Sequence, residues 1–192
     1  AALGIIETYI EVHDKNLHTA PLTEEITKEN ERLEKENQKK APHEIPPNGE
    51  MLLRVKNPLD EAVPFLKKLE QYSPNIPQTY EQGIELNLRR GKLLQVLRSI
   101  KQLLRVDKEN PAIYTGILRL YHNRDLSQEE DVSRKILFSE LSDLGITEQS
   151  LDASLRKLVD NYAERNKNSL RAQLALVDMR SLLSGQEKKD FS

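Results

Sequence analysis

Apolar residues in the middle of the chain recur at an interval of 34 positions. Tyr80 recurs as Tyr114, and Leu86 recurs as Leu120. The same interval relates two sets of three residues, which are Ala62, Leu66 and Leu69 in the first and Val96, Ile100 and Leu103 in the second. A period of about 34 residues is typical of helix-turn-helix units, which cannot bury their apolar faces alone and therefore stack on their neighbours. The repeat predicts stacked helical hairpins, whose surfaces serve to hold partners.

The period predicts an all-α fold, a fragment of a tetratricopeptide-like α-solenoid in which helical hairpins stack and a C-terminal helical cap follows. No strand is expected. Beyond Tyr121 the repeat register is lost and the predicted helices become longer, as in a cap that covers the last exposed face of a solenoid. The residues predicted to pack the repeats are Ala62, Leu66, Leu69, Tyr80, Val96, Ile100, Leu103 and Tyr114.

Composition narrows the class of protein. The 192 residues are 37% hydrophobic and 31% charged, which suits thin helical layers whose outer faces meet water. The net charge of -2 supplies no overall attraction to nucleic acid or to an anionic membrane. The lack of cysteine excludes disulfides and thiolate metal sites and favours a reducing compartment, so the cytoplasm is the expected location.

Changes in composition divide the chain into three predicted domains. Residues 1–20 form a terminal helix that we expect to belong to a preceding helical region, because its apolar face needs cover and it starts without a cap. Residues 21–57 form a charged, proline-containing connector, and residues 58–192 form the tetratricopeptide-like helical domain. The chain is therefore expected to be a fragment of a longer polypeptide. No stretch is apolar and long enough to span a bilayer.

Seven helices are predicted after the connector, at residues 58–72, 77–90, 92–106, 111–122, 128–144, 148–165 and 169–183. The residues predicted to cap helix starts are Asn57, Asn110, Ser127, Thr147 and Asn168. Pro64 falls inside the first of these helices and is expected to kink it or to shift its start.

No motif in the sequence indicates catalysis. A phosphate-binding glycine loop, an HExxH pair and a GxSxG turn are all lacking, and no cofactor motif is present. We interpret the four histidines as solvated or helix-end residues; they are His13, His18, His43 and His122. The carboxylates fall on highly charged surfaces, where no single pKa would be raised for acid and base work. We predict no catalytic, cofactor-binding or metal-binding residues.

One segment is locally basic. From Tyr80 to His122 there are eight positive and four negative residues, a difference of +4. The residues of this candidate polar interface are Arg89, Arg90, Arg98, Lys101 and Arg105. The last three lie at i, i+3 and i+7 and share one helical face, which could meet phosphate or an acidic partner. Such a stripe is more often the solvated side of an amphipathic helix. Because aromatic residues are few, RNA binding ranks behind protein binding.

Several segments, in the same order, are similar to those of a known family. They are AALGIIETYIEVHDKNL, NPLDEAVPFLKKL, LLQVLRSIKQLLRVDKENP with ILRLYHN, and AERNKNSL. They resemble the C-terminal part of the large auxiliary subunit of the N-terminal acetyltransferase A complex, from Ala1 to about Leu183. The resemblance depends on diffuse helical segments and includes no sharp catalytic motif.

The resemblance implies a non-catalytic scaffold, because members of this family are long tetratricopeptide solenoids that wrap a separate catalytic subunit. The implied partners are that catalytic subunit, mostly through regions missing here, and a small helical regulatory protein. The resemblance also implies contact with the ribosome. It implies no binding to membranes or to specific DNA sequences. Animal members carry a strongly basic run in the connector, whereas residues 21–50 here hold eight acidic and five basic residues. This difference argues against ribosome contact through the connector.

Three alternatives to the scaffold stay open at this point. An independent tetratricopeptide-like adaptor would use a carboxylate clamp, for which Arg89 and Arg90 are the only inner-helix basic pair in the repeats. A helical module could contact RNA through its basic face, and an enzyme of unknown type is the third alternative. Exposed leucines of the last three helices are the preferred candidates for a partner interface, since groove-facing and core-facing apolar residues share one periodicity.

Overall fold

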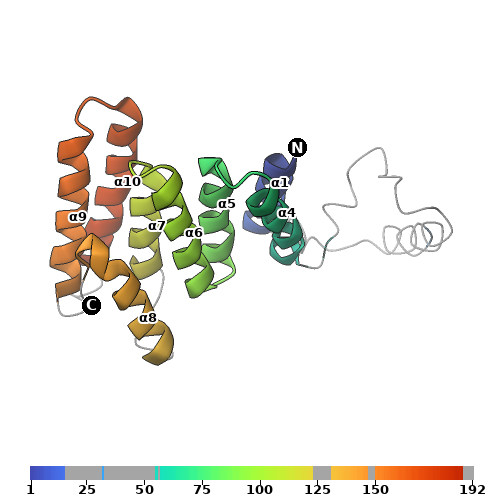
Figure 1. The fold of residues 1–192 in the computed structure, drawn as a ribbon, viewed down its shortest axis with the longest axis horizontal. Coiled ribbons are helices and arrows are strands. Elements are labelled where there is room, and N and C mark those ends of the chain that lie inside the picture. Colours follow the sequence, from blue (N-terminus) through green and yellow to red (C-terminus); the bar gives the residue numbers. More distant parts are fainter. Residues whose placement is uncertain (16–31, 33–54, 56, 123–130, 147–149, 188–192) are drawn as a thin grey trace. The chain divides into compact units, whose positions relative to one another are not determined.

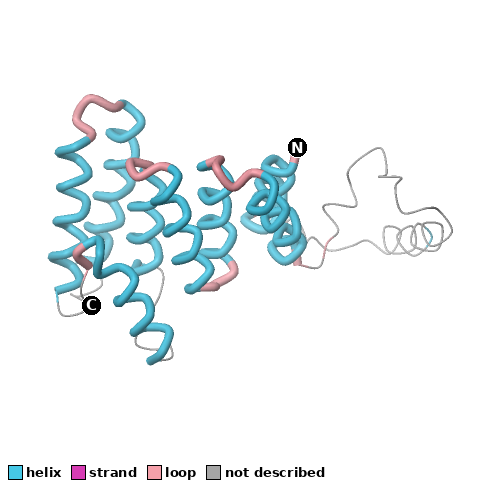
Figure 2. The backbone as a smooth tube through the Cα atoms, in the orientation of Figure 1, coloured by secondary structure: helices cyan, strands magenta, loops and turns pink. Residues whose placement is uncertain are grey.

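A computed structural model describes residues 1–15, 32, 55, 57–122, 131–146 and 150–187. In these ranges the regular structure is entirely helical, so the all-α prediction is confirmed (Figure 2). The chain divides into two compact units, residues 1–68 and residues 69–192. The predicted domain boundaries after residues 20 and 57 stay predictions, because most of the connector lies outside the described residues.

The first unit contains α1 (Ala2–Asp14) and most of α4 (Pro58–Tyr72). The residues of α1 that are buried are Ile6, Tyr9, Ile10 and Val12. The ring of Tyr9 lies 6.2 Å from that of Phe65 in α4, measured between centroids. Two of the repeat residues, Ala62 and Leu66, are buried on α4. Pro64 lies within α4, which still begins at Pro58, so the start of the helix is not shifted.

The second unit holds α5 (Pro77–Arg89), α6 (Leu93–Val106), α7 (Pro111–His122), α8 (Asp131–Leu141), a short 3-10 helix (Ser142–Leu144), α9 (Leu151–Arg165) and α10 (Leu170–Glu187) (Figure 1). These bounds follow the predicted ranges closely. The predicted starts of α8 and α9, with the proposed caps Ser127 and Thr147, fall on residues 123–130 and 147–149, outside the described residues.

Local chemistry explains where the repeat helices begin and end. Pro77 and Pro111, one repeat apart, are the first residues of α5 and α7, where a fixed φ suits a helix and the missing N–H costs nothing. The Oδ1 atom of Asn110 accepts a hydrogen bond from the backbone N–H of Ala112 at 3.0 Å, as expected of a cap. Gly91, at φ 67°, ends α5 in the left-handed conformation that glycine adopts without strain.

The start of α10 differs by one residue from its prediction. The hydroxyl of Ser169, not the side chain of Asn168, accepts a hydrogen bond from the backbone N–H of Ala172 at 3.3 Å. Serine and asparagine are equally suited to capping, so the choice depends on which residue adopts the extended backbone of a cap. The sequence alone does not fix that choice.

Helix α7 is central to the second unit. It contacts α5, α6, α9 and α10, and its Ile113, Ile117 and Leu118 are almost fully buried. A continuous apolar core runs from Tyr80 on α5 to Met179 on α10. Of the predicted repeat residues in this unit, Leu69 is half-buried and the buried ones are Tyr80, Val96, Ile100, Leu103 and Tyr114.

The close approach of α5 and α7 depends on a glycine. A Cβ atom added at Gly116 would lie 2.9 Å from the Cγ2 atom of Ile84, which is closer than real Cβ contacts come. Two residues before Gly116, the ring of Tyr114 packs on Tyr162 of α9 with centroids 4.3 Å apart. The repeat hairpin and the terminal helices therefore share one tightly packed core.

Candidate protein-binding surfaces

The C-terminal end of α5 carries the first two basic residues of the candidate polar interface. Arg89 donates a hydrogen bond to the Glu85 carboxylate at 2.6 Å, and Arg119 of α7 donates to the same carboxylate. Arg90 lies 3.3 Å from the Oδ1 atom of Asn87, a distance within hydrogen-bond range. Arg89 and Arg90 are therefore half-buried and bound within the repeat, which disfavours a carboxylate clamp formed by this pair.

The pKa of Glu85 is lowered by its two arginine neighbours, Arg89 and Arg119. Burial alone would raise the pKa, but the hydrogen bonds and charges of Arg89 and Arg119 outweigh burial and hold it below its ordinary value. The carboxylate stays ionised at neutral pH. It links α5 to α7 through Arg119.

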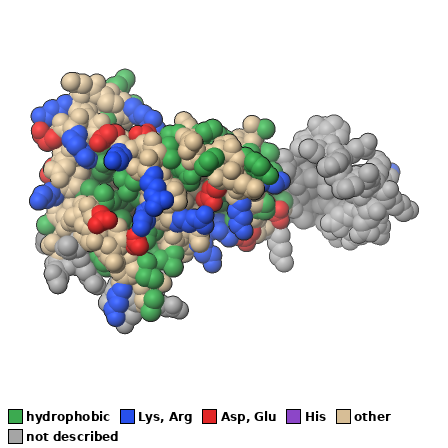
Figure 3. Space-filling model, in the orientation of Figure 1, with side chains coloured by type: hydrophobic (Ala, Val, Ile, Leu, Met, Phe, Trp, Pro, Cys, Tyr) green, Lys and Arg blue, Asp and Glu red, His purple; other side chains and the backbone are tan. Residues whose placement is uncertain are grey.

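The other three basic residues of the candidate polar interface lie on α6. Arg98 is exposed and lies 3.6 Å from the Glu70 carboxylate, and Lys101 contacts Glu140 of α8. Arg105 is exposed farther along the same helix. Lys and Arg side chains gather over α6 on the face shown in Figure 3. The structure thus separates the five predicted residues into a bound pair on α5 and a basic row on α6. Whether any of them contacts a partner stays a prediction.

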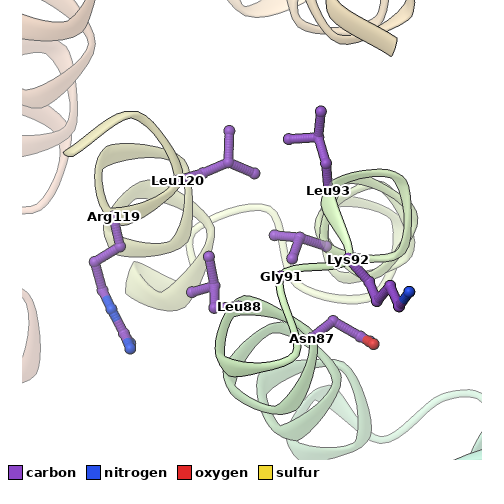
Figure 4. A pocket seen from close by; sticks show the side chains of 8 residues that line it. Asn87, Leu88, Gly91, Lys92, Leu93, Arg119 and Leu120 are labelled. Atoms are coloured by element: carbon purple, nitrogen blue, oxygen red, sulfur yellow. The ribbon is translucent and has the colours of Figure 1, made fainter. Parts of the chain in front are cut away.

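A small cavity lies where α5, α6 and α7 meet. It has a volume of about 90 Å³, and Leu88, Leu93 and Leu120 point toward one another across it, whereas Lys92 and Arg119 extend away (Figure 4). Ligand pockets typically measure about 300–1,000 Å³, so this space suits a few atoms at most. Its lining offers no nucleophile beside a base.

A larger groove of about 650 Å³ lies between the α6–α7 turn, the 3-10 helix and α9. Leu104, Leu144 and Leu158 line it together with both acidic and basic side chains. At the edge of this groove, the hydroxyl of Tyr114 accepts a hydrogen bond from Arg165 at 2.8 Å. Burial raises the pKa of Tyr114, so its hydroxyl stays protonated at neutral pH.

In the part of the chain that the structure describes, no three or more His, Cys, Asp or Glu side chains gather as metal ligands would. His13 lies beside Asp14 on α1, and His122 is half-buried at the end of α7. His18 and His43 lie outside the described residues. Within the same part of the chain, no helix is both long and apolar enough to cross a membrane.

Among the described residues, three exposed apolar side chains form a stripe on α10. Leu170, Leu174 and Val177, at i, i+4 and i+7, are 78%, 63% and 66% exposed. The opposite face of the helix buries Ala172, Leu176 and Met179 in the core. The α10 stripe includes Leu170 and Leu174, two of the leucines expected in an interface, and adds Val177, which was not predicted from the sequence. The α10 stripe is therefore a candidate surface for protein binding.

In the described residues, stacked helical hairpins carry an apolar stripe on α10 and a basic row on α6, an arrangement that defines a helical-repeat protein. A protein-family model described as "N-terminal acetyltransferase A, auxiliary subunit" matches residues 18–103. The chain is a relative of these auxiliary subunits, as the resemblance in its sequence predicted.

Individual relatives support this relationship. The chain is 26% identical to the N-terminal acetyltransferase A complex auxiliary subunit NAA15 of Arabidopsis thaliana over 75% of its length. It is 30% identical to the human N-alpha-acetyltransferase 16, NatA auxiliary subunit, over 72% of its length. In each case the chain spans 16% of the relative. The solved structure of Naa15/Naa10 bound to HypK-THB matches 74% of this chain and 18% of that one, at 25% identity and a TM-score of 0.55.

Proposed function

We propose that this chain is a non-catalytic scaffold segment of an N-terminal protein acetyltransferase complex, where it binds partner proteins and supports co-translational N-alpha-acetylation. The observation that carries the proposal is the stack of helical hairpins, which is similar to a solved auxiliary subunit in complex with other proteins. The described surfaces suit docking better than chemistry, because their cavities lack a nucleophile paired with a base.

The proposed partners are the catalytic acetyltransferase subunit and a small helical regulatory protein. The related structure contains Naa10 and HypK-THB beside Naa15, which supports one partner of each kind. Acetyl-coenzyme A would bind the catalytic partner and not this chain. The complex would act in the cytoplasm, on nascent chains.

The α10 stripe is the proposed docking surface for the regulatory protein. Its spacing of four and then three residues matches the ridge that an apolar helix presents to another helix. Leu170, Leu174 and Val177 are large and well exposed, so a helical partner would bury substantial apolar area there. The buried face of the same helix fixes the stripe in place.

A binding titration tests this proposal. The purified chain is titrated with a HypK-like regulatory protein and with the catalytic subunit. The double variant Leu174→Glu, Val177→Glu is compared with the double variant Val132→Glu, Ile136→Glu. Val132 and Ile136, on α8, are 65% and 39% exposed, so this control adds the same charge at another exposed apolar site. We expect the double variant to weaken regulator binding by about tenfold or more, while the control stays close to the unmodified chain. The proposal fails if the unmodified chain binds neither protein, and the docking surface is wrong if both variants bind alike.

A further inference from the structure

The solvent face of α6 has an unusual charge distribution. No Asp or Glu occurs from Leu93 to Val106, whereas the exposed or half-exposed residues include Arg98, Lys101 and Arg105. These three form the basic row, at i, i+3 and i+7, and extend about 10 Å along the helix at 1.5 Å per residue. Lys92 and Lys108 are exposed just beyond its two ends. The solvent face of α6 is therefore basic from Arg98 to Arg105.

The basic row already makes contacts with carboxylates from other helices. Arg98 lies 3.6 Å from Glu70, and its side chain is 62% exposed. Lys101 contacts Glu140, and these two side chains are 43% and 38% exposed. Ion pairs this exposed are weak and exchange readily with water or with other carboxylates. The row can therefore accept carboxylates from outside the chain without loss of structure.

We propose that the basic row of α6 binds an acidic amphipathic helix of a partner protein. Such a helix presents carboxylates three or four residues apart on one face, at the spacing of Arg98, Lys101 and Arg105. Leu94, which is 42% exposed, and the amide of Gln95 lie on the same helix and offer one apolar and one polar contact of the kind found at protein interfaces.

The same observations disfavour nucleic acid as the ligand. The basic row supplies three cations, whereas a nucleic-acid interface typically makes about six to ten contacts with phosphates. Residues 93–106 include no aromatic side chain on which a base could stack. A short acidic segment fits the space and the charge better.

The test uses the complete chain and a synthetic probe. The probe is a fluorescent alanine-based peptide of about 18 residues, long enough for partial helicity, with Glu on one face at i, i+4, i+7 and i+11. A second peptide carries Gln at those positions. An RNA duplex of about 20 base pairs provides the nucleic-acid arm. Fluorescence anisotropy gives the Kd of each at low salt and at physiological salt, since charge pairing is screened by ions.

The α6 variant replaces all three cations of the basic row by Gln: Arg98→Gln, Lys101→Gln, Arg105→Gln. The control variant removes the same charge from exposed residues of α9, the α9–α10 turn and α10: Lys157→Gln, Lys167→Gln, Arg180→Gln. We expect the α6 variant to bind the Glu peptide about tenfold more weakly and the control to change by less than about twofold. If the triple variant loses its helical circular dichroism signal, Arg105→Gln alone supplies the comparison.

Three results would overturn the inference. The Gln peptide could bind as tightly as the Glu peptide, or the α6 variant and the control could lose affinity equally. The RNA duplex could also bind more tightly than the Glu peptide and depend on the α6 residues, which would assign the face to nucleic acid. Binding of the acetyltransferase partners does not enter this experiment, so its outcome is independent of the proposed function.

Discussion

Glu85 and Arg119 stand 34 residues apart, one full repeat, and pair across two helices: the Arg119 guanidinium of α7 donates a hydrogen bond to the Glu85 carboxylate of α5. Arg89, one turn farther along α5, binds the same carboxylate. The repeat that is visible in the sequence thus becomes a direct contact between neighbouring hairpins. The contact also makes the stability of the stack depend on pH.

Replacing Glu85 by Gln should remove this pH dependence. The pKa of Glu85 is lowered on folding from its ordinary value of 4.5, so its contribution is full above that pH and is lost as pH falls through the lowered value. We expect Glu85→Gln to destabilise the chain by about 1 kcal/mol at pH 7, a figure reduced for partial exposure. The loss should shrink as the pH is lowered from 4.5 through the lowered pKa of Glu85.

Urea denaturation at several pH values, followed by circular dichroism, measures this difference. Glu164→Gln is the control, because Glu164 pairs with Lys167 at the surface, where the two side chains are 71% and 63% exposed. An equal loss at pH 7 and at low pH for Glu85→Gln would show that its charge has no part in the contact.

Gly116 and Ile84 should be energetically coupled. In the unmodified chain, Gly116→Ala gains helix propensity but places a Cβ 2.9 Å from the Cγ2 atom of Ile84, so we expect no net gain in stability or a loss. In an Ile84→Ala background the space is open, and the same substitution should stabilise the helix by about 1 kcal/mol. A double-mutant cycle of unfolding free energies measures the coupling. Identical effects of Gly116→Ala in the two backgrounds would contradict the close packing.

Asn110 should contribute more to stability than any surface cap. Only 1% of the residue is exposed, and its side chain caps α7 and donates a hydrogen bond to Glu81 of α5 at 2.7 Å. We expect Asn110→Ala to cost about 1–2 kcal/mol, and Asn168→Ala, which removes an exposed side chain beside the cap of α10, to cost little. Thermal denaturation compares the two variants. Equal melting temperatures would mean that the hydrogen bonds of Asn110 add nothing.

The two faces of α10 should respond differently to substitution. Leu176→Ala removes a core side chain that is 2% exposed and should cost about 2–5 kcal/mol. Leu174→Ala, on the α10 stripe, should change the unfolding free energy by less than about 0.5 kcal/mol. Chemical denaturation of both variants provides the comparison. A large loss for Leu174→Ala would show that this side chain belongs to the core of the chain and is not available for docking.

Helix positions could be predicted well from the sequence because their signals are local. Pro58, Pro77 and Pro111 begin helices in the structure at the predicted residues, since proline fixes the φ of a first helical residue. The repeat also predicted burial at Tyr80 and Tyr114. These features depend on a few residues that are neighbours in the chain.

Partners that are distant in the sequence could not be predicted. Arg89 donates a hydrogen bond to Glu85, which is only four residues away in the sequence. The second donor to the Glu85 carboxylate, Arg119, comes from the next hairpin. On α10 the apolar residues occupy two sides of one helix, and only packing decides that Leu176 is buried and Leu174 exposed. The sequence therefore indicated a polar interface and exposed leucines without separating bound residues from available ones.

An acetyl-transfer assay tests the scaffold role most directly. The purified chain is incubated with acetyl-coenzyme A and a peptide that begins with Ser or Ala, alone and together with a catalytic acetyltransferase subunit, and acetylated peptide is measured by mass spectrometry. We expect no turnover by the chain alone and turnover whenever the catalytic subunit is present. Acetylation of the peptide by the chain alone would contradict the proposal that the chain is a non-catalytic scaffold.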